Sequence, residues 1–251
     1  ISKTYLVRRL PVIIRLDGKA FHTLTRGLDK PFDMEFVNIM QHTMLKLCEN
    51  IQGCVLGYTQ SDEITLVLID YQNRDTCAWF DNQIQKMVSI SASMATLYFN
   101  QELSRLLKNA RDEIIKLDEG LPIDQHYIEL ETKWSSKEFK GVFDARVFNL
   151  PQWEVVNNLI WRQQDATRNS INAVAQSLFP HKQLQGINVS DLQNKMLTEK
   201  DVNWNNYATT LKRGCCAIKD HEGKWYIDNE IPIFTEDRNY IDRLVFIEDS
   251  E

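Results

Sequence analysis

The chain has 251 residues, of which 43% are hydrophobic and 25% charged, as expected for a globular protein with one large domain or a domain plus an appended helical part. No apolar run approaches the ~18 residues of a membrane span, and no basic start followed by an apolar stretch indicates a signal peptide. The formal net charge is -6, but Lys and Arg are in excess over the first thirty residues and acids are in excess from residue 220 onward. This asymmetry permits a basic working face on an acidic protein.

The cysteine and histidine patterns limit the kinds of metal site. The five cysteines form no C-x-x-C pair, and the five histidines are scattered. Both observations argue against a disulfide framework, a thiolate zinc site and a histidine-bound metal. We therefore expect a cytoplasmic protein with free cysteines, in which oxygen atoms hold any metal.

Apolar runs and helical spacing alternate along the first half of the chain. Residues 11–16 form a buried strand, and Asp33 caps a helix that ends before Gly53. A tight "TQSD" turn then joins two strands, which a second helix follows. The predicted ranges of these two strands and this helix are 54–58, 63–69 and 78–106.

The second half is less regular. Residues 107–140 are rich in charge and carry no clear pattern. A core strand closed by Pro151 and a long helix come next, and the remainder is mixed with two more strands. The predicted ranges of the core strand, the long helix and the last two strands are 142–150, 153–179, 214–218 and 224–228.

Strand, helix, strand, strand, helix, strand is the ferredoxin-like order. We therefore predict an α+β fold, with an antiparallel, palm-like sheet, packed helices and a C-terminal mixed region. We assign residues 1–150 to the palm-like core and 151–251 to a helical and mixed region packed on it as one integrated unit. In this topology the first and third strands are antiparallel neighbours. The end of the first strand, at Asp17, then meets the start of the third, at Asp62.

Two aspartates at adjoining strand ends repel each other unless a cation lies between them. Magnesium suits such a pair, because it takes one or two carboxylates and completes its shell with phosphate and water. Gly18 lets the backbone approach a metal or a triphosphate closely, and three neighbouring side chains can donate to phosphate oxygens. These donors are Lys19, His22 and Ser61. The alternative is that Asp17 begins a D-G turn and Asp62 is an ordinary hairpin-turn residue.

Six motifs in order resemble the tRNA-histidine guanylyltransferase family, over about residues 11 to 214. They read "RLDGKAFH", "KPFD", "GYTQSDE", "WFDNQIQK", "FDARVFNLP" and "WRQQDATRNSIN". The resemblance implies a polymerase-like palm that adds nucleotides to RNA 5′ ends in the 3′-to-5′ direction. It also implies that Asp17, the Gly18 carbonyl and Asp62 bind two magnesium ions.

The resemblance implies further roles for single residues. The catalytic residues would be Asp17, Asp62 and Glu63, although Glu63 either faces the site or only pairs across the sheet. The nucleotide would contact a set that includes the two basic motif positions Lys30 and Lys86, namely Asp17, Gly18, Lys19, Ala20, Phe21, His22, Lys30, Ser61, Asp62 and Lys86. The RNA would contact Arg15, Arg26, Lys30, Lys86, Arg162, Asn169 and Lys200.

The long helix carries a polar stripe and a departure from the family. Arg162, Asp165, Asn169 and Asn172 recur at steps of three and four, which a solvated helix face explains as well as an RNA contact does. Eukaryotic-type members have a His-Ile-Asn-Asn motif where this chain reads "TRNS" from Thr167. The chain is therefore more similar to the bacterial, archaeal and phage-type members, which resemble template-directed 5′-end repair enzymes.

The sequence thus predicts a magnesium-dependent 3′–5′ nucleotidyltransferase for tRNA 5′ ends. It would use ATP and GTP or other nucleoside triphosphates, and by resemblance it would form a homotetramer without any membrane partner. Three alternatives stay open: a dedicated tRNA-histidine guanylyltransferase, a palm enzyme such as a nucleotidyl cyclase, and a palm that only binds structured RNA. The paired Asp17 and Asp62 speak against the last, because a binding module has no use for two repelling acids.

Overall fold

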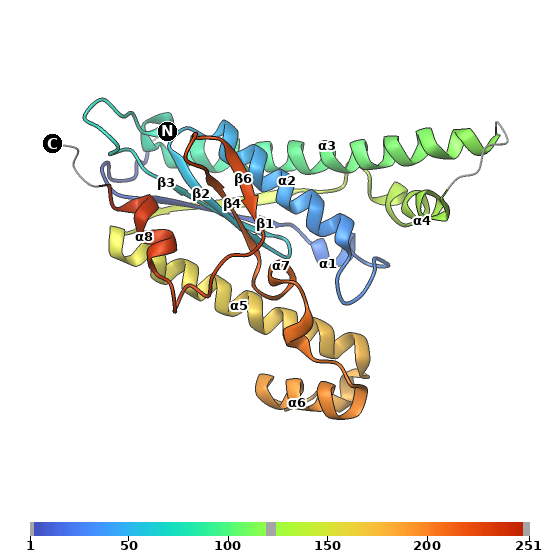
Figure 1. The fold of residues 1–251 in the computed structure, drawn as a ribbon. Helices are drawn as coiled ribbons and strands as arrows, with labels where there is room; N and C mark the ends of the chain where they lie inside the picture. The colour runs from blue at the N-terminus through green and yellow to red at the C-terminus, as the bar shows by residue number, and fades with distance from the viewer. Residues whose placement is uncertain (1–2, 119–123, 248–251) are drawn as a thin grey trace.

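A computed structural model describes residues 3–118 and 124–247. Its centre is a single antiparallel sheet of six strands in the order β4-β1-β3-β2-β5-β6 (Figure 1). The strands are β1 (Val12–Gly18), β2 (Cys54–Gln60), β3 (Glu63–Leu68), β4 (Phe143–Asn149), β5 (Cys215–Lys219) and β6 (Trp225–Asp228). The first four occur in the ferredoxin-like order, so the predicted fold class is confirmed.

The register of the sheet fixes the neighbours of Asp17. β1 pairs with β3 on one side and with β4 on the other, and Asp17 lies opposite both Glu63 and Asp144. The last two strands come from the C-terminal region and extend the same sheet from β2. The division of the chain at residue 150 stays a prediction, since both parts contribute strands to one sheet.

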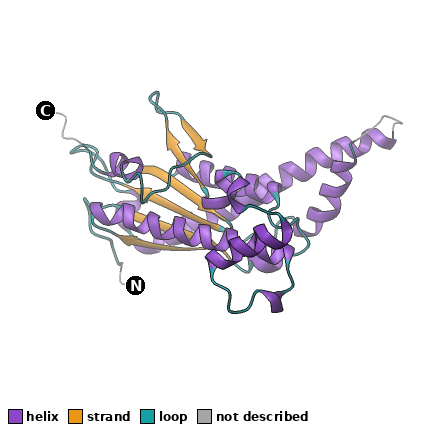
Figure 2. Cartoon of the chain, turned by 60° about the horizontal axis from the view of Figure 1, so that its bottom comes forward, coloured by secondary structure: helices purple, strands orange, loops and turns teal. Residues whose placement is uncertain are grey.

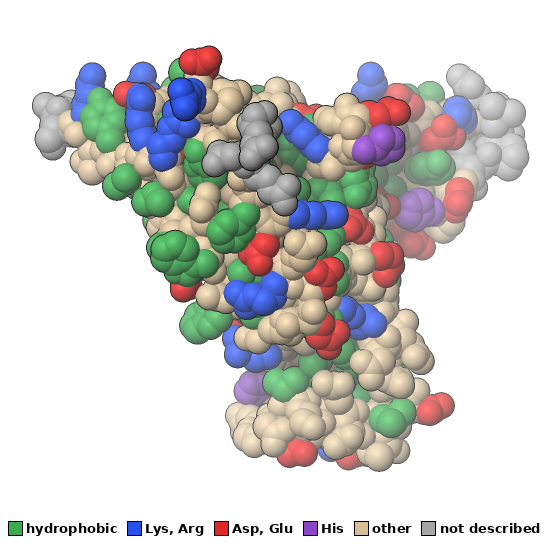
Figure 3. All heavy atoms as spheres, turned by 60° about the vertical axis from the view of Figure 1, so that its left-hand side comes forward, with side chains coloured by type: hydrophobic (Ala, Val, Ile, Leu, Met, Phe, Trp, Pro, Cys, Tyr) green, Lys and Arg blue, Asp and Glu red, His purple; other side chains and the backbone are tan. Residues whose placement is uncertain are grey.

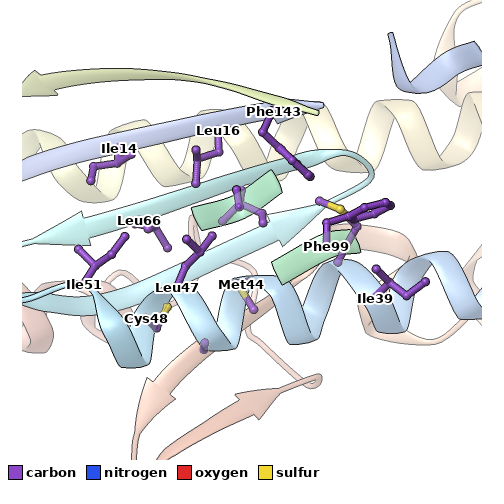
Figure 4. Close-up of a cluster of buried hydrophobic side chains, with 14 of the residues drawn as sticks. Ile14, Leu16, Ile39, Met44, Leu47, Cys48, Ile51, Leu66, Phe99 and Phe143 are labelled. Carbon is purple, nitrogen blue, oxygen red and sulfur yellow. The ribbon is translucent and has the colours of Figure 1, made fainter. Parts of the chain in front are cut away.

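Two helices, α2 (Met34–Asn50) and α3 (Ile84–Asp118), cover one face of the sheet. The predicted cap is present, because the Asp33 carboxylate accepts a hydrogen bond from the amide of Phe36 at 3.0 Å. Alternate residues of β1, including Ile14 and Leu16, meet the apolar side of α2 in a cluster that also contains Met44 (Figure 4). Because successive side chains of a strand point to opposite faces, Asp17 points to the other face of the sheet, as Ile13 does.

The opposite face is covered by α5 (Gln152–Leu178) and α8 (Asn239–Val245). Here Ile13 and Val67 pack with Val155 and Leu159 in a second buried cluster. Three further α-helices are short: α1 (Phe21–Leu24), α7 (Thr209–Arg213) and α6 (Val189–Lys200), the last of which packs on the C-terminal part of α5. Four 3-10 turns cover Trp79–Asn82, Ser135–Lys137, His181–Gln183 and Trp204–Asn206.

The charge-rich segment with no predicted structure forms a helical arm. α3 continues twelve residues past the predicted end at 106, and α4 (Gln125–Trp134) lies beside it (Figure 2). The two helices bury only a narrow apolar contact, which includes Leu107, Ala110 and Trp134. Since so few apolar positions are needed to join two helices, the charged residues around them hide the helical period.

Charge is unevenly distributed over the surface. On the face shown in Figure 3, acidic and basic side chains are interspersed, with a group of Lys and Arg at one end. Among the described residues, no helix combines the length and the apolar character that a membrane span requires.

Candidate active site

The candidate site lies where β1 ends beside the turn between β2 and β3. The amide of Gly18 donates a hydrogen bond to the Asp62 carbonyl at 3.0 Å, which ties the end of β1 to this turn. The turn is tight, because Ser61 and Asp62 alone join the two strands and Ser61 has a left-handed φ of 51°. The predicted meeting of Asp17 and Asp62 is therefore present in the fold.

The environment of Asp62 disfavours its ionised form. Burial raises the pKa of the Asp62 carboxyl, and the negative charge of Asp17 raises it further. A hydrogen bond from the Ser61 hydroxyl, 3.2 Å from Oδ1 of Asp62, acts in the opposite direction. Two carboxylates held in this way are stabilised by any cation that binds between them.

The donor set at this point fits magnesium. In the part of the chain that the structure describes, no group of three or more His, Cys, Asp or Glu side chains is arranged to hold a metal. Asp17 and Asp62 offer two carboxylates, and Gly18, which directly follows Asp17, offers a backbone carbonyl oxygen. A site with so few protein ligands suits an ion that keeps water and substrate phosphate in its shell.

Gly18 and Phe21 have a packing role at the same point. A Cβ atom on Gly18 would lie 2.5 Å from the Phe21 ring, so only glycine fits here. Phe21 is 2% exposed, and the centre of its ring lies 5.1 Å from the centre of the Phe99 ring. Phe21 is a core residue that supports the turn, and it also lines the cavity beside Asp62, so its predicted contact with nucleotide stays a prediction. Ala20, between them in the chain, is exposed and has a left-handed φ of 57°.

Glu63 follows Asp62 in the chain but has a different environment. Its carboxylate forms ion pairs with Arg15 of β1 and with Arg162 of α5, the latter at 3.2 Å. The side chains of Glu63 and Arg162 are only 10% and 14% exposed. Glu63 thus faces α5 and pairs across the sheet as well. Both arginines were predicted to contact RNA, and the structure gives each of them this intramolecular partner.

A cavity of about 390 Å³ opens beside Asp62. Several predicted residues line it, and His22 and Lys30 lie on one wall while Asn169 of α5 lies on another. Apolar side chains from the segment between α1 and α2 and from α2 itself form much of its surface, namely Leu28, Phe32, Phe36, Val37 and Met40. A cavity with apolar walls and a polar rim is the usual form of a site for a small organic ligand.

Sequence reasoning missed the contribution of α2 and α7 to this cavity. Gln41 of α2 donates hydrogen bonds to Thr210 at 3.0 Å and to Asn229 at 2.8 Å. A signal for Gln41 exists in the sequence, because this polar residue stands in the apolar helical stripe between Val37 and Met44. No comparable signal marks Thr210, whose position depends on long-range packing.

Two basic residues of the predicted set, Lys86 and Lys200, lie away from Asp17. Lys86 is in the first turn of α3, where its Nζ lies 5.7 Å from the Phe80 ring centre, next to the start of β1. That start is about 16 Å from Asp17 along the strand. Lys200 lies over the Phe179 ring at the α5–α6 end, and Arg26 is exposed on the loop after α1. Within one chain, Lys86 and Lys200 are therefore not brought to the aspartate pair.

The polar stripe on α5 is only partly a solvated face. Arg162 turns inward to Glu63, and Asn169 reaches the cavity. Asp165 pairs with Arg168 at 3.0 Å on the helix surface, and the Asn172 amide donates to the Arg168 carbonyl at 2.8 Å. The stripe therefore faces the site at two of its four positions.

A palm-like sheet with two carboxylates at adjoining strand ends, beside a cavity for a small ligand, defines a nucleotidyl-transferring class of enzyme. A family model described as tRNAHis guanylyltransferase matches residues 2–151, and the chain belongs to this family of nucleotidyltransferases that act on tRNA. This finding removes the RNA-binding-only palm as an alternative. The motif resemblance noted in the sequence is thereby confirmed.

Solved structures and curated relatives agree with this assignment. A bacterial tRNA(His) guanylyltransferase (Thg1)-like protein in complex with ATP is 41% identical to this chain and superposes on it with a TM-score of 0.83. The match covers 98% of this chain and 94% of that protein's chain. A bacterial protein of the same description in complex with GTP is 36% identical, with 97% and 93% coverage and a TM-score of 0.73. A probable tRNA(His) guanylyltransferase from Dictyostelium discoideum is 24% identical over 85% of this chain and 77% of its own length.

Proposed function

We propose that the protein adds nucleotides to tRNA 5′ ends in the 3′-to-5′ direction, under the control of a template base, with two magnesium ions at Asp17 and Asp62. The observation that carries the proposal is the aspartate pair itself, with the raised pKa of Asp62 at the rim of the cavity. Such a pair has little structural purpose, because it costs folding free energy until a cation binds.

The chemistry divides into two transfers that the family resemblance implies. First, an oxygen of the RNA 5′-monophosphate attacks the α-phosphorus of ATP, and pyrophosphate leaves. Second, the 3′-hydroxyl of the incoming nucleotide attacks the 5′-phosphorus of the activated RNA, and AMP leaves. Magnesium, when bound, stabilises the negative charge that builds on the attacking and leaving oxygens.

The residues around the pair have distinct tasks in this scheme. Asp17, the Gly18 carbonyl and Asp62 hold the metal ions, and Lys19, His22 and Ser61 donate to phosphate oxygens. The cavity receives the base and ribose, with Lys30 and Asn169 at its wall. Holding the triphosphate against the RNA 5′ end supplies the proximity on which phosphoryl transfer mostly depends.

The preference for repair over dedicated guanosine addition rests on α5. Thr167 occupies the position of the histidine in the His-Ile-Asn-Asn motif of eukaryotic-type members. The solved structures that are 41% and 36% identical are described as guanylyltransferase-like proteins. Without a dedicated base-selecting motif, pairing with an opposing base becomes the source of nucleotide choice, since each base offers a different set of hydrogen bonds.

The test uses 5′-truncated tRNAs whose opposing acceptor-strand base is varied, with ATP, magnesium and each of the four nucleotides. We expect the complementary nucleotide to be incorporated in each case, and Asp17→Ala serves as the inactive control. Addition of guanosine regardless of the opposing base would overturn the repair proposal and favour a dedicated tRNA-histidine guanylyltransferase. The homotetramer is tested separately, by sedimentation of the purified protein.

A further inference from the structure

The turn between α4 and β4 lies directly beside the exit of β1. The amide of Lys19 donates to the carbonyl of Val142 at 2.8 Å, and the Lys137 ammonium donates to the carbonyl of Arg26 at 2.8 Å. These contacts join the base of the helical arm to the loop after α1. Residues from the arm therefore stand next to the candidate active site, although the arm itself projects from the sheet (Figure 1).

Four cations gather at this junction without a carboxylate partner. Lys19, Arg26 and Lys140 are exposed, Lys137 is half-buried, and within the described chain none of them has a carboxylate oxygen within 4.0 Å. The side chains of this basic surface are Lys19, Arg26, Lys137, Phe139 and Lys140. Burial lowers the pKa of Lys137, and the charge of Lys140 lowers it further, while the nearby charge of Asp33 acts in the opposite direction.

The acids that could neutralise the basic surface are occupied elsewhere. Asp29 pairs with Lys133 of α4 at 2.7 Å, and Glu138 pairs with Arg111 of α3 at 3.0 Å. Asp33 is buried and caps α2. In a protein of net charge -6, a local group of free cations therefore calls for an anionic partner.

Phe139 adds an exposed aromatic ring to these cations. Its side chain is 73% exposed, although it is flanked by residues that fold back on the body of the protein. Its φ of 59° is left-handed, a conformation that a bulky residue rarely adopts. Lysines that track a phosphate backbone, with an aromatic ring on which a base stacks, form the usual surface for a nucleic-acid strand.

We propose that the basic surface binds the RNA strand whose 5′ end enters the candidate active site. The RNA phosphates lie on Arg26, Lys137 and Lys140 and a base stacks on the Phe139 ring, while Lys19, which the proposed function assigns to the triphosphate, borders the reacting end. The proposal rests on the proposed function for the identity of the RNA. Lys19 lies two residues from Asp17, so the bound phosphates belong to nucleotides next to the reacting end.

The test measures equilibrium binding of a 5′-truncated tRNA to the full chain over a series of salt concentrations. Phe139→Gly removes the ring and fits the left-handed backbone, so its melting temperature should equal or exceed that of the parent. We expect this variant to bind tRNA about 5- to 150-fold more weakly, the range for loss of one stacked base. Lys140→Gln should weaken binding and reduce the slope of log affinity against log salt by about 0.7 to 0.9.

Lys224→Gln is the matched control. Lys224 is exposed in the β5–β6 turn, and the substitution removes the same charge at the opposite end of the sheet. Its tRNA affinity should equal that of the parent, and all three variants should bind ATP as the parent does. Parent-like tRNA affinity and salt slope in both Phe139→Gly and Lys140→Gln would overturn the proposal. That result would leave nucleotide addition intact, so it is distinct from a failure of the proposed function.

Discussion

Asp62 and Glu63 are neighbours in the chain, and they meet opposite electrostatic surroundings. Glu63 is buried between the guanidinium groups of Arg15 and Arg162, so its charge is neutralised within the protein. Asp62 has the Ser61 hydroxyl and a second carboxylate, that of Asp17, as its neighbours, and burial raises its pKa. The fold supplies cations to one acid, whereas for the other the proposed function supplies a cation from solution.

From this difference we infer a structural role for Glu63 and a chemical role for Asp62. Removing Glu63 leaves two cations without their partner inside the sheet–helix interface, which acts on stability. Removing Asp62 relieves a repulsion and takes away half of the carboxylates available to a metal, which acts on activity. Each prediction below tests one side of this separation.

The largest effect is expected for the aspartates. Replacing Asp17 or Asp62 with Ala should lower the rate of nucleotide addition by several orders of magnitude, because each change removes one of two carboxylate ligands. Circular dichroism and melting temperature should show an intact fold. Near-normal turnover of Asp62→Ala with magnesium would place the chemistry elsewhere.

The second effect is on stability and concerns Glu63. Glu63→Gln should lower the free energy of unfolding by about 3 kcal/mol, since it leaves the partly buried guanidinium group of Arg15 without a counter-charge and Arg162 with only Asp165, 3.9 Å away. Urea unfolding measures this change, with the exposed Glu236→Gln as the matched control. An unchanged unfolding midpoint would mean that the two ion pairs contribute nothing to the fold.

A smaller effect concerns the pH dependence of stability. Because the pKa of Asp62 is raised in the folded protein, the folded state holds this proton more tightly than the unfolded chain does. The contribution of Asp62 to stability therefore falls as the pH rises from the ordinary carboxyl pKa of 3.8 through the raised value. Asp62→Asn should be more stable than the parent at pH 7 and lose that advantage on acidification, as urea unfolding at several pH values would show. An advantage that did not vary with pH would contradict the raised pKa.

Part of this contrast could be predicted from the sequence. The apolar runs gave the strand order, and the order placed Asp17 beside Asp62, because antiparallel neighbours bring opposite strand ends together. The partners of Glu63 lie 48 and 99 residues away. No local pattern identifies such partners, since Arg15 reaches Glu63 through the pairing of β1 with β3 and Arg162 through the rotation of α5 over the sheet. Motif spacing similarly suggested a role for Lys86 at the site, whereas the fold places it at the other end of β1.

The central claim is that a divalent cation binds at Asp17 and Asp62 and not at Glu63. The most direct measurement is the binding of Mn²⁺, as a paramagnetic substitute for magnesium, in the presence of ATP, with ATP alone as the reference. We expect the parent and Glu63→Gln to bind the ion, and Asp17→Asn and Asp62→Asn to lose most of that binding. Parent-like Mn²⁺ binding by Asp62→Asn, or its loss in a folded Glu63→Gln protein, would contradict the account.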